Sequence, residues 1–205
     1  MNLISLKTPL SREDVEILRV GDIVTINGYI FTSRGQFHIR FIENGQVPPL
    51  KKSQHNVMIH SGPIVKRVGN KWEMRAMSVT TSIRFDKWEP DVIRRLGIRA
   101  IIGKGKVGRK TQSALCKYGC VHLGKIGAVG GAYATMVEKI EEGIWLDLGL
   151  PEATWILRVK DFGPLVVMAD IRGFSIFDDR DDHIISQVHN IYRKLGIENF
   201  TFAEK

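Results

Sequence analysis

The sequence predicts an α/β fold in which helices cover a mixed sheet. Two observations carry this prediction. Short segments rich in β-branched residues alternate with segments whose apolar residues recur at helical spacing. The chain has 205 residues, of which 43% are hydrophobic and 25% charged, and this is the composition of a folded domain. No linker or internal repeat interrupts it, so we expect one compact domain over residues 1–205.

The first half of the chain predicts four strands and two helices. A helix over about 38–43 ends at Asn44-Gly45, and Thr80 or Thr81 caps a second helix that ends near Gly97, with Pro90 making its first half irregular. The expected strands cover 22–31, 57–60, 64–68 and 71–76, the last two forming a hairpin around Gly69-Asn70.

The second half alternates more regularly. We expect strands over 99–102, 120–123, 155–160 and 164–169, and helices over 109–118, 128–138 and 178–195. Strands that alternate with helices in this way are typical of an α/β layer.

The positive charge of the chain is concentrated in one segment. The net charge is +8, yet residues 92–137 contain nine basic and no acidic residues, so the rest carries 21 basic and 22 acidic residues. A local positive field beside many glycines suits an anionic partner, such as a carboxylate, a phosphate or nucleic acid, or else forms a solvated basic face. The segment holds only two aromatic residues, Tyr118 and Tyr133, which argues against a nucleic-acid partner because bases bind on aromatic platforms.

Apolar runs, the N-terminal residues and the cysteines indicate the cellular compartment and the state of the thiols. No apolar run approaches the roughly 20 residues that span a bilayer, and the N-terminal residues do not resemble a secretion signal, so we expect a cytoplasmic protein without membrane contact. Cys116 and Cys120 stand four apart on a predicted helix and are expected to be free thiols. Two thiolates cannot complete an iron–sulfur or structural zinc site, so we expect no metal ligands in this chain.

The glycine-rich loop at 103–108 matches G-x-G-x-x-G between a strand and a helix. A dinucleotide site also needs an acidic residue about 20 positions later, and none precedes Glu138. The loop also misses the spacing of a phosphate-binding P-loop, so a nucleotide-binding module is a remote alternative. Glycines still let backbone amides approach an anion, and Lys104 adds a charge there.

Two polar clusters follow predicted strands. Arg34 and His38 stand at the start of a helix, where His38 could exchange protons near neutral pH. Thr80, Thr81 and Arg84 stand at another helix start, where hydroxyls, free amides and a guanidinium could hold a carboxylate. Each cluster alone is also compatible with an ordinary surface.

Six motifs in order make the chain resemble a known family. They are TSRGQFHIR at 32–40, HSGPIV at 60–65, KWEM at 71–74, TTSIRF at 80–85, IIGKG at 101–105 and VKDFGPLVV at 159–167. From about residue 8 to 170 the chain resembles the β subunit of the iron–sulfur hydro-lyases, the class I fumarate hydratases and L(+)-tartrate dehydratases.

The resemblance implies a swivelling β/β/α domain, a hydro-lyase active only with an α subunit, and a [4Fe–4S] cluster bound by that partner. It implies fumarate as the most favoured dicarboxylate substrate, with tartrate as the alternative. It implies roles for six residues: Arg34, Thr81, Arg84 and Lys104 in substrate binding, and His38 and Thr80 in catalysis.

Two departures from the family pattern concern local geometry. Gly35 stands where the family usually has Asp, so a partner of Arg34 or His38 is missing or moved. Ser78-Val79 replaces the usual Gly-Pro before the two threonines.

Overall fold

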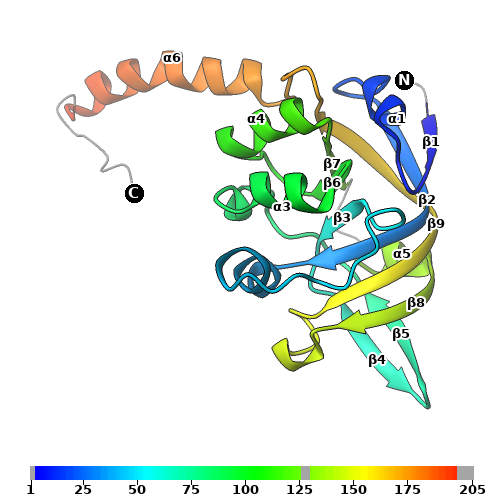
Figure 1. Ribbon diagram of the computed structural model, residues 1–205. Coiled ribbons are helices and arrows are strands. Elements are labelled where there is room, and N and C mark those ends of the chain that lie inside the picture. Colours follow the sequence, from blue (N-terminus) through cyan, green and yellow to red (C-terminus); the bar gives the residue numbers. More distant parts are fainter. Residues whose placement is uncertain (1–2, 126–129, 198–205) are drawn as a thin grey trace. The chain divides into compact units, whose positions relative to one another are not determined.

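The computed structural model describes residues 3–125 and 130–197 and confirms the α/β class (Figure 1). The chain divides into two compact units, Met1–Ser175 and Ile176–Lys205. The elements follow in the order β1 (Leu3–Lys7), α1 (Arg12–Glu16), β2 (Ile23–Ser33), α2 (Gly35–His38), η1 (Ile39–Glu43), β3 (Val57–His60), β4 (Ile64–Val68), β5 (Lys71–Ala76), η2 (Ser82–Phe85), α3 (Glu89–Leu96), β6 (Ala100–Gly103), α4 (Arg109–Tyr118), β7 (Val121–Lys125), α5 (Gly130–Thr135), β8 (Val137–Ile144), η3 (Leu146–Leu148), β9 (Thr154–Ala169) and α6 (Asp178–Leu195).

The sheet of the first unit is mixed and partly closed. Its strand order is β1-β2-β3-β6-β7-β9-β8, and an additional pairing of β2 with β9 joins β2, β3, β6, β7 and β9 into a ring. The pairs from β1 to β7 are parallel, whereas β9 runs antiparallel to β2, β7 and β8. A separate hairpin of β4 and β5 turns at Gly69, as the sequence predicts.

Two apolar clusters fill the two sides of the strands. Along β3, Val57 and Ile59 belong to the larger cluster and Met58 to the other, because successive side chains of a strand point to opposite faces. The second cluster contains apolar side chains of α2, η1, α3 and α4. Helices α3 and α4 pack against each other (Figure 1). Strands covered on both faces carry continuous apolar runs, which explains segments such as AIIG in β6.

Several predicted elements differ from the structure. The helix expected over 128–138 falls partly outside the described residues, and its end is wrong because β8 begins at Val137. The strands expected over 155–160 and 164–169 are one strand, since β2 pairs with β9 on both sides of Asp161, whose amide donates to Asn27 Oδ1 at 2.8 Å. In both cases strand pairing overrides local propensity: β8 pairs with β9, the next strand along the chain, and β9 pairs with the distant β2.

The helix expected from Thr80 or Thr81 to Gly97 is interrupted. Thr81 precedes only the short 3-10 helix η2 and makes no side-chain cap, and α3 begins at Glu89. Gly97 ends α3 in the left-handed conformation, with φ of 69°, as the sequence predicts. Strand β1 and helix α1 were not predicted, although Ser11 and Asp14 form a capping box that marks the start of α1.

The second unit consists mainly of α6, which matches the predicted range of 178–195. The helix ends at Gly196, whose φ of 66° is left-handed. Among the described residues, no helix is both long and apolar enough to cross a membrane. The single domain over 1–205 and its swivelling motion stay predictions.

Candidate functional site

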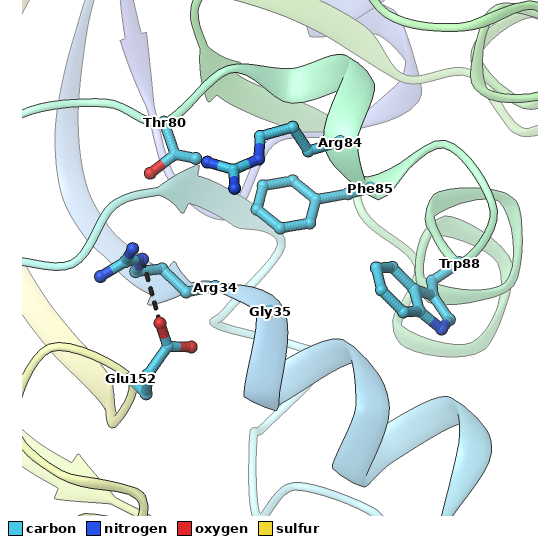
Figure 2. A pocket seen from close by; sticks show the side chains of 7 residues that line it. All are labelled: Arg34, Gly35, Thr80, Arg84, Phe85, Trp88 and Glu152. Atoms are coloured by element: carbon cyan, nitrogen blue, oxygen red, sulfur yellow. Dashed lines mark ion pairs between the residues drawn. The ribbon is translucent and has the colours of Figure 1, made fainter.

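A cavity of about 220 Å³ opens where parallel strands end. The chain continues from the carboxyl ends of β2, β3 and β6 into Arg34, Ser61 and Lys104, and neighbouring parallel strands end at one edge of a sheet. The lining consists of Arg34, Gly35, Thr80, Arg84, Phe85, Trp88 and Glu152. Figure 2 shows the two guanidinium groups and Thr80 on one side of it, and the aromatic rings on the other.

Arg34 is held at the cavity by its backbone and by an ion pair of its guanidinium group. Its backbone is extended at the N-terminus of α2, and its Nε lies 3.2 Å from Glu152 Oε1. Glu152 also accepts from the Gln36 amide at 3.0 Å. A Cβ on Gly62 would approach Arg34 Cδ and Nη1 to 2.5 Å, so only glycine at this position leaves room for the arginine. Glu152 thus supplies a carboxylate partner for Arg34, which Gly35 cannot.

Thr80 reaches the cavity because residues 79–82 cross the strand ends. Val79 bridges Ser61, the Thr80 amide donates to the His60 carbonyl at 2.6 Å, and Thr81 bridges Lys104. Arg84 follows on η2 and is exposed. Within the described part of the chain no carboxylate pairs with its guanidinium, which leaves it available to an anion.

His38 lies behind the cavity wall and is fully buried. Its ring stacks on Phe85 at a centroid distance of 4.5 Å and an interplanar angle of 6°. Its Nδ1 is 2.7 Å from the Arg34 carbonyl oxygen, and its Nε2 is 3.2 Å from Glu89 Oε2. Both ring nitrogens therefore face protein groups and not the cavity.

Thr81 and Lys104 lie beside the cavity without lining it. The Lys104 carbonyl accepts from the Ser82 amide at 3.0 Å, and the Lys104 side chain is exposed. Of the six residues expected at the site, the structure therefore brings Arg34, Thr80 and Arg84 to the cavity wall.

A carboxylate of the protein itself, that of Asp86, lies against the glycine-rich loop. Asp86 Oδ1 accepts from the Thr111 amide at 2.9 Å and from its hydroxyl at 2.7 Å, at the N-terminus of α4. A Cβ on Gly108 would come within 2.1 Å of Asp86 Cγ. The carboxylate thus occupies the place that a phosphate takes in nucleotide-binding loops.

Sequence reasoning missed a buried polar network beneath the cavity. Glu89, His60, Ser82 and His122 are at most 3% exposed. His60 and Ser82 belong to the motifs HSGPIV and TTSIRF, but neither was expected at the site. Glu89 gave no signal, because an acidic residue in the first turn of a helix is normally a solvated residue that favours the helix. The fifth missed residue is Glu152, which no sequence signal marked.

The network perturbs two pKa values. Burial alone raises the pKa of Glu89, but the charge of His60 and the hydrogen bond and charge of His38 outweigh burial and lower this pKa to about 2. Burial, together with the charge of His60, lowers the pKa of His122 to about 3. At neutral pH the network therefore contains a carboxylate and a neutral His122.

The described residues offer one candidate metal site and no cluster site. His38, His60 and Glu89 each offer one ligand atom, and the three atoms lie within 4.8 Å of one another. Cys120 is fully buried and follows the end of α4 instead of sharing its face with Cys116. Burial raises the pKa of both thiols, and neither lines the cavity, so the residues of this chain do not fit an iron–sulfur cluster.

The arrangement can hold a small carboxylate anion. Two guanidinium groups and a hydroxyl donate on one side, and Phe85 and Trp88 offer an apolar wall. The cavity is smaller than the roughly 300–1,000 Å³ of sites for drug-sized ligands.

Comparison with known proteins identifies the family. The model of the family "Fumarase C-terminus" matches residues 1–180. The chain is 36% identical over 190 residues to the L(+)-tartrate dehydratase subunit beta of Escherichia coli K12, covering 89% of this chain and 94% of that one. It is 39% identical over 178 residues to the "Putative fumarate hydratase class I" of Geobacillus stearothermophilus, covering 86% of this chain and 34% of that one. A cavity with two arginines at the strand ends thus occurs in a chain that belongs to the Fumarase C-terminus family.

Proposed function

We propose that this chain is the β subunit of a [4Fe–4S] hydro-lyase, a fumarate hydratase that reversibly converts fumarate to L-malate. The observation that carries the proposal is the meeting of Arg34, Arg84 and Thr80 in one cavity. Family membership supports it, as do relatives named for a fumarate hydratase and a tartrate dehydratase.

The reaction explains the residue types. Adding water across the double bond of fumarate builds negative charge on the carboxylate next to the carbon that takes the proton. Arg84, which has no ion-pair partner in the described structure, can bind that carboxylate with two parallel hydrogen bonds. Such an interaction strengthens as the charge develops, so it lowers the barrier and does more than bind the substrate. Lys104 and the basic segment around it attract the dianion toward the cavity.

The two residues expected in catalysis lie at different positions, since Thr80 lines the cavity and His38 does not. The Thr80 hydroxyl lies at the cavity wall, where it can contact substrate and exchange a proton with it if its environment activates it. His38 contacts the cavity wall through the Arg34 carbonyl and through its stack on Phe85, and neither of its ring nitrogens faces the cavity. We therefore propose Thr80 as the proton-transfer group.

The cluster belongs to a partner in this proposal. The two thiols of this chain do not fit it, so a separate α subunit would bind the cluster, which supplies a Lewis-acidic iron for the leaving hydroxyl. The dicarboxylate would then lie between that subunit and the arginine side of this cavity. Two free thiols suit a reducing compartment, and we propose the cytoplasm.

Tartrate is the second candidate substrate. The match to the L(+)-tartrate dehydratase subunit beta of Escherichia coli K12, which covers 89% of this chain and 94% of that one, supports it. Tartrate and malate both carry two carboxylates and a leaving hydroxyl, so the same arginines serve both substrates.

The test is reconstitution with the α subunit under anaerobic conditions, followed by assays with fumarate, malate and both tartrate enantiomers. We expect turnover of fumarate and malate with the complex and none with this chain alone. Turnover of L(+)-tartrate alone would select the second candidate, and turnover of neither substrate by an intact, cluster-loaded complex would refute the proposal.

A further inference from the structure

Three buried donor atoms lie close together behind the cavity wall. His38 Nε2 and His60 Nε2 each lie 3.2 Å from Glu89 Oε2, and the three atoms are all within 4.8 Å of one another. Each of these side chains is at most 1% exposed. They belong to α2, β3 and α3, so the fold brings three potential metal ligands from separate parts of the chain to one place.

Hydrogen bonds alone leave one of these donor atoms without a partner. A carbonyl oxygen only accepts, so the 2.7 Å contact with Arg34 places the proton of a neutral His38 on Nδ1 and leaves a lone pair on Nε2. One shared proton would satisfy the contact of this Nε2 with Glu89. Among the described residues, however, His60 Nε2 has no hydrogen-bond partner, although Glu89 Oε2 is 3.2 Å away. A fully buried ring nitrogen without a partner is rare and needs an explanation.

The spacing of the donor atoms fits the coordination shell of a metal ion. Tetrahedral zinc, with bonds of about 2.0–2.2 Å to nitrogen and oxygen, holds neighbouring ligand atoms roughly 3.3 Å apart. The two 3.2 Å distances to Glu89 Oε2 agree with this value. A cation would accept a lone pair from each of the three atoms, His60 Nε2 included. Glu89 Oε1, which has no hydrogen-bond partner in the described part of the chain, is a fourth donor on the same carboxylate.

The second nitrogen of each histidine faces an oxygen that can accept its proton. Histidines that bind metal usually donate their other ring N–H to a carbonyl or a similar group, which fixes the orientation of the ring. His38 Nδ1 meets the Arg34 carbonyl, and His60 Nδ1 lies 3.2 Å from Ser82 Oγ. A Cβ on Gly103 would come within 1.9 Å of Ser82 Oγ, so glycine at this position leaves room for the serine. Both rings are therefore held with Nε2 toward Glu89.

We propose that His38, His60 and Glu89 bind one divalent metal ion, and that zinc suits this set of two imidazoles and a carboxylate. The ion is structural, because none of its three ligands lines the cavity. Phe85, which does line it, packs on both histidine rings at centroid distances of 4.5 Å. The site is independent of the proposed function, since neither the substrate nor a cluster takes part in it.

The ion would fix the cavity wall from behind. It joins the end of α2 to the end of β3 and the first turn of α3. His38 then donates Nδ1–H to the Arg34 carbonyl and binds the ion through Nε2, so neither nitrogen is free to take a proton from substrate. His38 is thus a positioning residue for Arg34. The expectation of no metal ligands in this chain concerned its two thiols, and this site uses neither.

The competing assignment is a hydrogen-bonded cluster in which protons take the place of the ion. The first experiment decides between the two with the full chain, produced without a histidine tag in medium containing zinc and dialysed against metal-free buffer. Elemental analysis should find one zinc ion per chain. X-ray absorption at the zinc edge should show nitrogen and oxygen ligands at about 2.0–2.2 Å and no sulfur at about 2.3 Å. A chain without zinc, or zinc bound to sulfur, overturns the proposal even if every variant below fails to fold.

Variants locate the ion within the chain. His60→Asn and Glu89→Gln each remove a ligand, so both proteins should be purified without zinc. His183→Asn removes a histidine at an exposed position of α6 and should keep one zinc ion per chain. Zinc that remains in both ligand variants, or that is lost from the control, would place the ion elsewhere and overturn the assignment.

The second experiment measures thermal unfolding of the chain after a chelator has removed its metal. An ion that binds only the folded state stabilises it, so about 100 μM zinc should raise Tm by at least roughly 5 °C if its Kd is about 1 μM or lower. The same addition should leave the Tm of His60→Asn unchanged, and no rise in the wild type would overturn the proposal. Acid protonates histidine ligands and releases metal, so measurements of stability against pH use the chelated chain.

Discussion

Acid should destabilise this protein through His122, and the effect can be worked out from its pKa. The side chain is 1% exposed on β7, and its pKa in the folded protein is about 3 against about 6.5 in the unfolded chain. Between these values the unfolded chain binds a proton that the folded protein does not. The folded state is therefore fully favoured above pH 6.5 and loses stability as the pH falls toward 3.

The expected size of this loss at pH 5 is about 2 kcal/mol, because pH 5 lies 1.5 units below 6.5 and each unit corresponds to about 1.4 kcal/mol. Glu89 adds little at pH 5, since the stability from its lowered pKa is lost only between about 4.5 and 2. For a chain of this size the loss lowers Tm by roughly 4–8 °C.

The measurement is urea unfolding at pH 8 and pH 5, for the wild type and for His122→Gln. Gln cannot titrate, and its amide can still reach Ser82, so the variant should be less stable at pH 8 but lose about 2 kcal/mol less between the two pH values. His183→Gln, at an exposed position of α6, should retain the wild-type loss. If His122→Gln loses as much free energy of unfolding as the wild type, His122 is not kept neutral by burial.

Three further outcomes concern the cavity. Arg84→Lys should reduce kcat/KM of the complex by roughly 30- to 1000-fold, because an ammonium cannot replace two parallel hydrogen bonds. Arg94→Lys, on the exposed face of α3, should change kcat/KM little, and equal values for the two variants would place Arg84 outside the site. Gly62→Ala should raise KM, because the added methyl group displaces Arg34, and a normal KM would contradict the crowding. Gly131→Ala in α5, where a Cβ meets nothing, should leave KM unchanged and stabilise the fold by up to about 1 kcal/mol. The isolated chain should show no hydratase activity in a standard assay, and turnover without the partner would contradict the two-subunit proposal.

Local sequence patterns predicted most helices and strands of this fold but not its closure. The β4–β5 hairpin and α4 lie where the pattern placed them, since turn glycines and apolar periodicity are local signals. Strand β8 was missed because its glutamates favour a helix, and only its pairing with β9 makes it a strand.

The candidate site, like the fold, could be predicted only in part. That Arg34, Thr80 and Arg84 would lie near one another could be predicted, because each follows or begins a recognisable element and belongs to a motif, whereas their roles stay predictions. Glu89 and Glu152 could not, because their roles depend on which elements lie next to one another in space, and the spacing of residues in the chain does not contain that information.

The ring of strands also determines when the cavity can form during folding. Strand β9 closes the ring against β2 by pairs such as Ile23 with Val166, which are far apart in the chain. Closing so long a loop is entropically costly, and folds dominated by such contacts fold slowly. Arg34 follows β2 and Glu152 precedes β9, so their ion pair extends the same strand pair. A nascent chain whose β9 is still inside the ribosome therefore lacks the binding site. Substrate can stabilise only molecules in which the ring of strands has closed.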